Sequence, residues 1–338
     1  MKYDRILLAH GGGGLLTNEL IQEVFLPAFS NPLLAPLQDG AVVKVGQEKL
    51  CFTTDSYVVH PLFFPGGNIG SLAVHGTVND LSMCGGVPLY LSAGFILEEG
   101  FPVANLRKII QTMAEAAREA QVHIVTGDTK VVPKGAADGI FINTAGLGVI
   151  RYPWPISTAS IQPGDVIILN GNIGDHGAAL VNEREGFGFA SDLQSDSAPL
   201  NHLVAAVLAA SDGVHAMRDC TRGGLGAILA EMAGQSAMLM EIDETMIPIR
   251  EAVRGFCEVL GFDPLFLANE GKMVLFCAEE DGQKALAAMR ANPYGREAAV
   301  IGRVRQAAGR GGRVIMKNAI GGLREITVPA NELLPRIC

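Results

Sequence analysis

The stretch SLAVHGTVNDLSMC, residues 71–84, decides the fold. Its apolar residues recur at four- and three-residue steps, the spacing of one face of an α-helix: Val74, Val78 and Leu81. His75 and Asn79 lie four residues apart on a neighbouring face. The pattern therefore predicts a helix with one side in the core and another side that carries selected polar groups.

Segments on both sides of this helix have strand composition. AVVKVG (41–46) and KLCFTTDSYVV (49–59) are joined by Gly46 and Gln47, which is typical of a hairpin. We read HIVTGDTKVV (123–132) as strand, turn and strand, and GIFINTAGLGVI (139–150) as a buried strand. A second helix is expected at about 103–120, with a charged exposed face.

A domain boundary is expected where the composition changes. RYPWPISTASIQPGD (151–165) is rich in proline and small polar residues, and VIILNGNIGDHGAALV (166–181) then starts a second unit as strand, glycine turn and helix. The sequence predicts an α+β protein with mixed or antiparallel sheets. Its expected parts are an N-terminal domain, a C-terminal domain and a flexible tail: 1–153, 154–326 and 327–338.

Composition limits the class of protein. The chain has 338 residues, of which 49% are apolar and 18% charged, which indicates a well-supplied core and room for two domains. The net charge of −9 argues against nucleic-acid binding, since phosphate neutralisation needs a basic surface. Apolar runs are far shorter than a membrane span and no signal-peptide pattern opens the chain, so we expect a cytoplasmic protein without a membrane partner.

Six cysteines are irregularly spaced, without a C-x-x-C pair, so neither a zinc ribbon nor a disulfide framework is indicated. Five of them lie within or beside apolar stretches and are expected to be small buried residues. Cys338 differs, because it ends the segment NELLPRIC. A thiol at the end of a tail suggests a group that moves.

Four aspartates lie next to turns or helix starts within apolar surroundings: Asp55, Asp80, Asp128 and Asp219. Magnesium prefers hard oxygen ligands and keeps several waters, so a few carboxylates from distant segments suffice for a nucleotide site. A single aspartate in a turn is usually only a turn residue. Several in such places favour a Mg²⁺ site.

DCTRGGLGAILAEMA (219–233) places Gly223 and Gly224 before a clear helix. A helix start offers free N–H groups that suit a phosphate, and Thr221 and Arg222 can add contacts. The alternative is a helix cap with tight glycine packing. The chain has no G-x-x-x-x-G-K-[ST] P-loop, and its GGGG run (11–14) is either a ligand-approach loop or a flexible entry.

FLANEGKMVLF (266–276) places Glu270 immediately before a strand-like segment. A carboxylate among apolar residues has a raised pKa and can act as a general base. Lys134, in a glycine-containing loop, can orient a reacting group. For each residue a surface charge or a structural salt bridge is the alternative.

Together these segments resemble the superfamily of aminoimidazole ribonucleotide synthetase, selenophosphate synthetase and thiamine-monophosphate kinase, which bind ATP without a P-loop. The resemblance is closest to the HypE family, the carbamoyl dehydratases of [NiFe]-hydrogenase maturation, and covers essentially the whole chain. It rests on GGGG, VNDLSMCGG (78–86), TGDTKVV (126–132), DCTRGGL (219–225), NEGKMV (269–274) and the final PRIC.

The resemblance implies a reaction and partners. Similar proteins receive a carbamoyl group on the terminal thiol from the carbamoyltransferase HypF, use ATP to dehydrate the thiocarbamate to a thiocyanate, and pass the cyanide to iron on the HypC–HypD complex. A homodimer paired through strands of the N-terminal domain is also implied. A tail of this length spans about 30 Å when extended, which lets the thiol visit several sites.

The resemblance also implies residue roles. Asp55, Asp80 and Asp219, with Asp128 as a further member, are expected to bind Mg²⁺ and phosphate. The nucleotide pocket is expected to contain Asn79, Gly127, Thr129, Lys130, Thr221, Gly223 and Gly224. Cys338 carries the substrate and Glu270 removes the amide N–H protons. Lys134 orients the carbamoyl group, and His75 contacts phosphate or the tail.

Two other functions stay open on the sequence alone. One is a selenophosphate synthetase-like enzyme, although LAHGGGGLLTNE (8–19) lacks the reactive Cys of that reaction. The other is a non-catalytic carrier or scaffold that binds nucleotide and only presents Cys338, because binding and turnover use the same aspartates.

Overall fold

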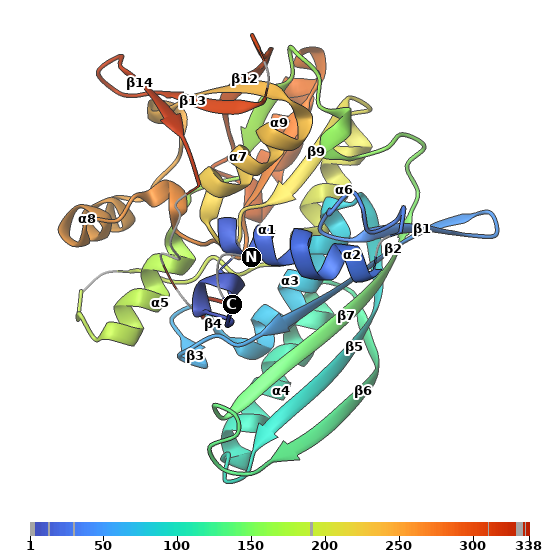
Figure 1. Cartoon of the computed structure of the whole chain (residues 1–338), viewed down its shortest axis with the longest axis vertical. Helices are drawn as coiled ribbons and strands as arrows, with labels where there is room; N and C mark the ends of the chain where they lie inside the picture. Colours follow the sequence, from blue (N-terminus) through green and yellow to red (C-terminus); the bar gives the residue numbers. More distant parts are fainter. Residues whose placement is uncertain are drawn as a thin grey trace.

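A computed structural model describes residues 4–12, 14–29, 31–189, 192–309, 311–328, 334 and 336–338. It contains two main β-sheets, one towards each end of the long axis, with helices packed around them (Figure 1). The C-terminal end of the chain is drawn near the middle of the molecule, between the two sheets. No helix within these described ranges is long and apolar enough to cross a membrane.

The N-terminal half is built on a five-stranded sheet with strand order β1-β2-β7-β5-β6. Neighbouring strands are antiparallel except β5 and β6, which are parallel. The strands are β1 (Ala41–Val45), β2 (Glu48–Tyr57), β5 (Gly86–Glu98), β6 (His123–Val132) and β7 (Ile140–Ile150). A small hairpin of β3 (Phe63–Phe64) and β4 (Gly67–Asn68) follows β2.

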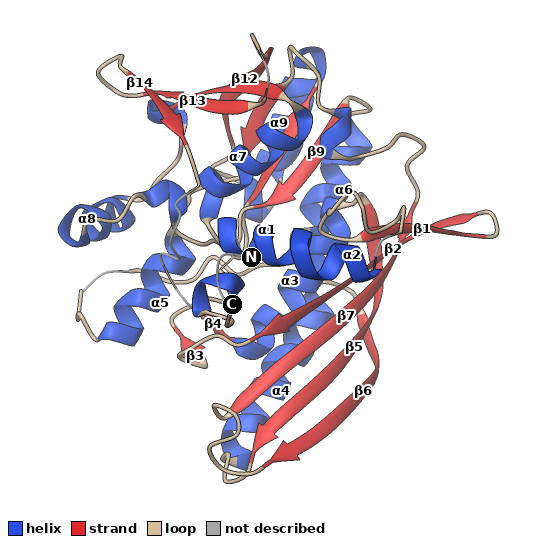
Figure 2. Cartoon of the chain, viewed as in Figure 1, coloured by secondary structure: helices blue, strands red, loops and turns tan. Residues whose placement is uncertain are grey.

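Two helices cover one face of this sheet, α3 (Ile69–Met83) and α4 (Val103–Glu119) (Figure 2). α3 is buried almost all round because it packs on the sheet, on α4 and on the C-terminal half. Near the N-terminus, α1 (Leu15–Leu20) continues through a π-helical turn, Ile21–Phe25, into α2 (Leu26–Phe29). Because α3 contacts both the five-stranded sheet and elements of the C-terminal half, it lies between the two halves.

The C-terminal half is built on a seven-stranded mixed sheet with strand order β14-β13-β10-β12-β8-β11-β9. β10 and β13 are parallel, and the other neighbours are antiparallel. The strands are β8 (Val166–Leu169), β9 (Val214–Asp219), β10 (Met238–Asp243), β11 (Met273–Cys277), β12 (Ala299–Gln306), β13 (Arg313–Lys317) and β14 (Leu323–Ile326).

Helices pack on both faces of this sheet and form separate apolar clusters with it. α7 (Gly224–Ser236) packs against β10 and β13, while α6 (Asn201–Ala210) and α9 (Glu279–Ala291) pack together on the other side. α5 (Asp175–Glu185) and α8 (Glu251–Leu260) contact one another beside the sheet. β8, β9 and β11 contribute buried side chains to both clusters and thus lie between two helical layers.

Most sequence-based expectations about elements are confirmed. The helix expected at 71–84 is α3, the hairpin turn is at Gly46 (φ +62°), and the second helix is α4. The five-stranded sheet ends at Ile150 and the seven-stranded sheet begins at Val166. These limits agree with a domain change within 151–165, while the boundary at residues 153 and 154 stays a prediction.

The reading of 123–132 as two strands and a turn is wrong, because β6 is one continuous strand. Gly127 and Asp128 pair across to Ala93 and Gly94 of β5. A Cβ on Gly127 would lie 2.4 Å from the carbonyl oxygen of Ala93. The glycine therefore permits close approach of two strands rather than a turn.

Candidate functional site

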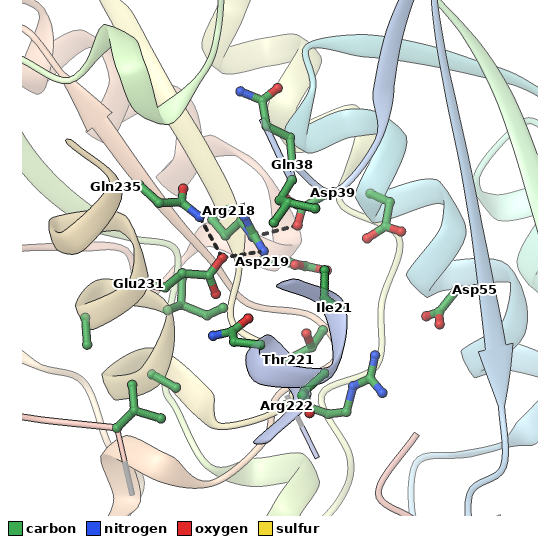
Figure 3. Close-up of a pocket in the computed structure, with 18 of the residues that line it drawn as sticks. Ile21, Gln38, Asp39, Asp55, Arg218, Asp219, Thr221, Arg222, Glu231 and Gln235 are labelled. Atoms are coloured by element: carbon green, nitrogen blue, oxygen red, sulfur yellow. Dashed lines mark hydrogen bonds and ion pairs between the residues drawn. The ribbon is translucent and has the colours of Figure 1, made fainter. Parts of the chain in front are cut away.

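A cavity of about 680 Å³ lies between the two sheets. Its lining residues come from α1, from β2 and α3 of the N-terminal half, and from β9 and α7 of the C-terminal half (Figure 3). The lining includes the four aspartates Asp39, Asp55, Asp80 and Asp219, together with Arg218, Thr221, Arg222, Glu231, Glu270 and Cys338. Polar groups from both halves of the chain thus converge on one cleft.

Three of the carboxylates gather closely. Asp39 precedes β1, Asp80 lies in the last turn of α3 and Asp219 ends β9, yet one carboxylate oxygen of each lies within 4.8 Å of the others. Burial is the main cause that raises the pKa of Asp39 to about 6 and that of Asp219 to about 8; neighbouring carboxylates contribute to both shifts and Arg218 opposes them. Three hard oxygen donors that repel one another form a set that a divalent cation such as Mg²⁺ would stabilise.

Two neighbours hold this cluster. The Arg218 guanidinium lies 2.6 Å from Asp39 and 3.4 Å from Glu231 of α7. The Thr53 hydroxyl lies 2.9 Å from Asp80 Oδ2 and 2.7 Å from the backbone carbonyl oxygen of Asp39. Arg218 partly compensates the negative charge, and Thr53 fixes the spacing of two members.

The start of α7 closes another side of the cleft. Gly223 and Gly224 have φ values of +77° and +63°. A Cβ on Gly224 would lie 2.5 Å from the carbonyl oxygens of both Leu265 and Leu267. These glycines therefore bring the helix start against its neighbours, and Thr221, just before them, lines the cavity.

Glu270 is 3% exposed and lines the same cleft. Its Oε1 atom has no hydrogen-bond partner among the residues described. Burial raises the pKa of Glu270 well above its usual value, with Asp219 and Asp196 adding to the effect and Arg222 opposing it. A buried carboxyl group with an unused oxygen is suited to exchange a proton with a substrate.

The terminal thiol reaches this cleft. Cys338 is 7% exposed, and burial raises the pKa of its thiol while Arg222 opposes the rise. Arg222 lines the cavity too, and its Nη1 donates to the carbonyl oxygen of Gly11, 3.1 Å away, in the N-terminal glycine run. Of the expected tail, residues 329–333 and 335 lie outside the described residues. The last residue, Cys338, lies in the lining of the cleft.

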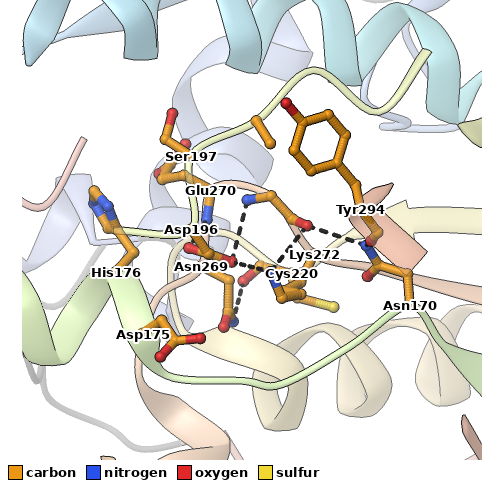
Figure 4. A network of polar contacts seen from close by, with 12 residues as sticks. Asn170, Asp175, His176, Asp196, Ser197, Cys220, Asn269, Glu270, Lys272 and Tyr294 are labelled. Atoms are coloured by element: carbon orange, nitrogen blue, oxygen red, sulfur yellow. Dashed lines mark hydrogen bonds and ion pairs between the residues drawn. The ribbon is translucent and has the colours of Figure 1, made fainter. Parts of the chain in front are cut away.

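A polar network lies behind Glu270 (Figure 4). Asp196 accepts from the backbone N–H of Glu270 at 3.0 Å and pairs with Lys272 Nζ at 2.9 Å. Burial would raise the pKa of Asp196, but Lys272 outweighs burial and the pKa is below its usual value. Asn79 donates to the backbone carbonyl oxygen of Glu270 at 3.3 Å. The backbone of Glu270 is thus held from both sides.

Two expected site residues on α3 lie beside the cleft rather than in its lining. Asn79 is buried and also bonds the backbone of Ala198 and Leu200, so all its visible contacts position neighbouring backbone. His75 Nδ1 lies 2.9 Å from Ser197 Oγ, and burial lowers the pKa of His75 to about 4. His75 is therefore neutral near pH 7.

Five expected site residues lie outside the lining of the cavity: Gly127, Asp128, Thr129, Lys130 and Lys134. β6 is an edge strand, and the Asp128 carboxylate pairs with Lys130 Nζ at 2.6 Å on the surface. Lys134 is exposed in the following loop. In a single chain these residues are separate from the carboxylate cluster, and their roles in binding stay predictions.

Sequence reasoning missed Asp39, Arg218 and Asp196 as site residues. Asp39 stands before a glycine and a strand in QDGAVV, the same kind of position that selected the other aspartates, so the signal was present. Arg218 and Asp196 offered none, because their importance arises only from the residues that folding brings beside them.

Comparisons with known proteins agree with this arrangement. Family models match at 37–150 (AIR synthase related protein, N-terminal domain) and at 162–315 (AIR synthase related protein, C-terminal domain). The chain is 51% identical over 331 residues to carbamoyl dehydratase HypE of Azotobacter vinelandii, covering 98% of this chain and 96% of that protein.

Solved structures give the same result. The crystal structure of hydrogenase maturation protein HypE in complex with ATP superposes with a TM-score of 0.84 at 48% identity, covering 99% of this chain and 100% of that one. A chain of the crystal structure of a HypE–HypF complex gives a TM-score of 0.87 at 44% identity, covering 92% of this chain and 99% of that one. The chain belongs to the AIR synthase related family and, within it, to the HypE carbamoyl dehydratases.

Proposed function

We propose that this chain uses ATP to dehydrate an S-carbamoyl group on Cys338 to a thiocyanate, which supplies the cyanide ligand of the [NiFe]-hydrogenase iron. The observation that carries the proposal is the shared cleft. The cleft is lined by the terminal thiol, by a carboxylate cluster suited to a metal nucleotide, and by Glu270, whose Oε1 atom has no hydrogen-bond partner in the described part of the chain. A substrate carrier, a base and a phosphate site are thus in one place.

The reaction needs a better leaving group than an amide oxygen. Transfer of the γ-phosphoryl group to the carbamoyl oxygen, loss of both N–H protons and departure of phosphate convert R–S–CO–NH₂ and ATP into R–S–C≡N, ADP, phosphate and a proton. We assign the N–H protons to Glu270, because burial raises the pKa of its carboxyl group well above the usual value and its Oε1 atom has no hydrogen-bond partner among the described residues. Lys134 and His75 are retained as orienting residues.

Mg²⁺ would be held by Asp80 and Asp219, with Asp39 as a further ligand and Asp55 beside them. When bound, the ion neutralises phosphate charge and orients the transferring group. Thr221, which lines the cavity, and the neighbouring N-terminus of α7 would contact phosphate oxygens, since a helix N-terminus offers free N–H groups. Asp128 stays a predicted metal contact. The predicted nucleotide contacts further include Asn79, Gly127, Thr129 and Lys130.

Partners follow from the chemistry of the tail. A crystal structure of a HypE–HypF complex exists for a relative, and we propose the carbamoyltransferase HypF as the loading partner here. The HypC–HypD complex is proposed as the acceptor of cyanide, and the cytoplasm as the place of reaction.

We also propose a homodimer. The face of the five-stranded sheet opposite α3 and α4 carries exposed apolar side chains, among them Phe52, Tyr90 and Ile96. A second copy that packs there would cover these side chains. It would also place β6, with Asp128 to Lys130, in or beside the interface.

Intact mass spectrometry tests the function. After incubation with HypF, carbamoyl phosphate and ATP, the C-terminal peptide should gain about 43 Da, and Mg²⁺-ATP should then remove about 18 Da from the isolated loaded protein. A peptide that loads but never loses water contradicts a dehydratase and supports the carrier alternative. Cys338→Ala, which removes the carrier atom but no carboxylate, should show neither change while it retains ATP binding.

A further inference from the structure

The last residues of the chain are bound as an added strand. The backbone N–H of Val58 donates to the carbonyl oxygen of Cys338 at 3.0 Å, and that of His60 donates to the carbonyl oxygen of Arg336 at 3.2 Å. Residues 58 and 60 thus face 338 and 336, the spacing of an antiparallel pair. Peptides recognised in this way gain affinity from main-chain hydrogen bonds.

Two side chains of α5 hold the same segment from the other side. Arg184 donates to the carbonyl oxygens of both His60 and Arg336, at 2.6 Å and 2.8 Å from Nη2, and its Nε also bonds that of His60. One guanidinium therefore links the tail to the 58–60 segment. Charge-assisted bonds of this kind are among the stronger ones in proteins.

His176 holds the residue between them. Its Nε2 lies 2.8 Å from the carbonyl oxygen of Ile337, which can only accept, so Nε2 carries the proton. Its Nδ1 then accepts from Ser195 Oγ at 2.7 Å. Burial lowers the pKa of His176, which keeps the ring in this neutral form.

Side chains of the tail are recognised as well. Arg336 pairs with Asp138 of the β6–β7 loop and donates from Nε to the carbonyl oxygen of Val58 at 2.9 Å. Ile337 is 3% exposed and belongs to the apolar cluster of Tyr57 and the hairpin region. None of these contacts uses the thiol of Cys338, so a group attached to the sulfur leaves them intact.

We propose that residues 58–60, Asp138, His176 and Arg184 form a specific binding site for the peptide Arg-Ile-Cys at the end of the chain, here called the tail groove. Arg184 and His176 are positioning residues that fix the tail backbone, and Asp138 selects the basic side chain. Binding in the tail groove directs the Cys338 thiol into the cleft. The use of the groove in dehydration rests on the proposed function, but the binding itself does not.

Alkylation of the full chain by iodoacetamide tests the tail groove without ATP or any partner. Cys338 is protected from alkylation while the tail is bound. The alkylation rate of Cys338 therefore reports the fraction of chains with an unbound tail, and peptide-resolved mass spectrometry measures that rate. Arg184→Ala removes a charged donor from two carbonyl groups and should raise that rate about tenfold or more. Arg118→Ala, an arginine in the corresponding last turn of α4, is the matched control and should leave the rate unchanged.

The other five cysteines, which are buried, report whether each variant is folded. If Arg184→Ala alkylates Cys338 at the wild-type rate while folded, the proposal is overturned. If all six cysteines react together, the variant has unfolded, and the proposal is then tested by exchanging the charges of the exposed pair Asp138 and Arg336. Asp138→Arg and Arg336→Asp should each raise the rate about two- to fivefold, and the double exchange should restore protection. Failure of that restoration rejects the selectivity assigned to Asp138.

The proposed function is tested separately by mass change. A chain with a protected Cys338 that loads but never loses water contradicts the dehydratase and leaves the tail groove standing. A wild-type chain whose Cys338 reacts as fast as that of the Arg184→Ala variant contradicts the tail groove and leaves the dehydratase standing.

Discussion

Asp219 and Asp128 stand in similar sequence settings, each within a short motif that contains glycine, but their surroundings differ completely. Asp219 is 5% exposed at the end of β9 and lies against Asp39 and Asp80. The side chain of Asp128 is 69% exposed on the edge strand β6 and is paired with Lys130. One aspartate is buried in a crowded cluster of carboxylates, whereas the other is exposed beside a cation.

The difference appears in the direction of the pKa shifts. Burial raises the pKa of Asp219 to about 8, while the hydrogen bond from Lys130 lowers the pKa of Asp128. A cluster that resists ionisation gains most from a bound divalent cation, because the cation removes the repulsion among its members. The comparison teaches that similar motifs can place an aspartate in very different surroundings, and that of these two only Asp219 lies where carboxylates converge in the way that favours a divalent cation.

The largest expected effect is on catalysis. Asp219→Asn and Asp80→Asn each keep the shape of the cluster but remove one anionic oxygen donor, so Mg²⁺-ATP turnover by the carbamoylated chain should fall by about 100-fold or more. The measurement is the rate at which the carbamoylated protein releases phosphate from ATP. Asp212→Asn, at an exposed position, is the control. Near-normal turnover of both cluster variants would remove the cluster from the mechanism.

The second effect is on stability in chelator-treated protein. A carboxyl group whose folded pKa is raised above its unfolded value stabilises the fold fully below about pH 3.8, and this contribution is lost as pH rises through the folded pKa. Asp219 should therefore make the wild type lose on the order of 3 kcal/mol or more relative to Asp219→Asn between pH 4 and 8. Urea unfolding of both proteins across this range measures the difference.

The free energies of unfolding of the wild type and Asp219→Asn must be compared, because His75 changes the pH dependence of stability in the opposite direction. Burial lowers its pKa to about 4, so its contribution to stability is lost as pH falls from about 6.5 to 4. This term is common to both proteins and cancels. Addition of Mg²⁺ should stabilise the wild type more than Asp219→Asn. A pH-independent difference would show that Asp219 is ionised throughout.

Local patterns explain why much of the fold could be predicted. The 3.6-residue periodicity of α3 and the glycines before α7 are written in consecutive residues, and both helices form where expected. Asp80, Asp219 and Glu270 were found for the same reason, since each stands at the end or start of a recognisable element. Local signals suffice where the structure itself is local.

Long-range contacts explain the failures. The glycine in β6 was taken for a turn because its real reason, the carbonyl group of Ala93 on a neighbouring strand, is not visible in its own segment. Likewise the resting place of Cys338 depends on residues 58–60 and on α5, far away in the chain. No pattern within PRIC predicts those partners.

The smallest expected effect concerns β6 and sharpens the comparison most. If the proposed homodimer brings Asp128 and Lys130 to the cleft of the other copy, the variant Asp128→Asn/Lys130→Ala should keep its melting temperature, since the pair is exposed, yet lose about tenfold in turnover.

Co-expression of this variant with Asp80→Asn then places both defects in one site of each mixed dimer and leaves its other site intact. About a quarter of wild-type turnover should return, because about half of randomly assembled dimers are mixed. Turnover equal to the average of the separate variants would mean that β6 acts within its own chain, and full turnover of the β6 variant alone would mean that the Asp128 and Lys130 side chains take no part in the reaction.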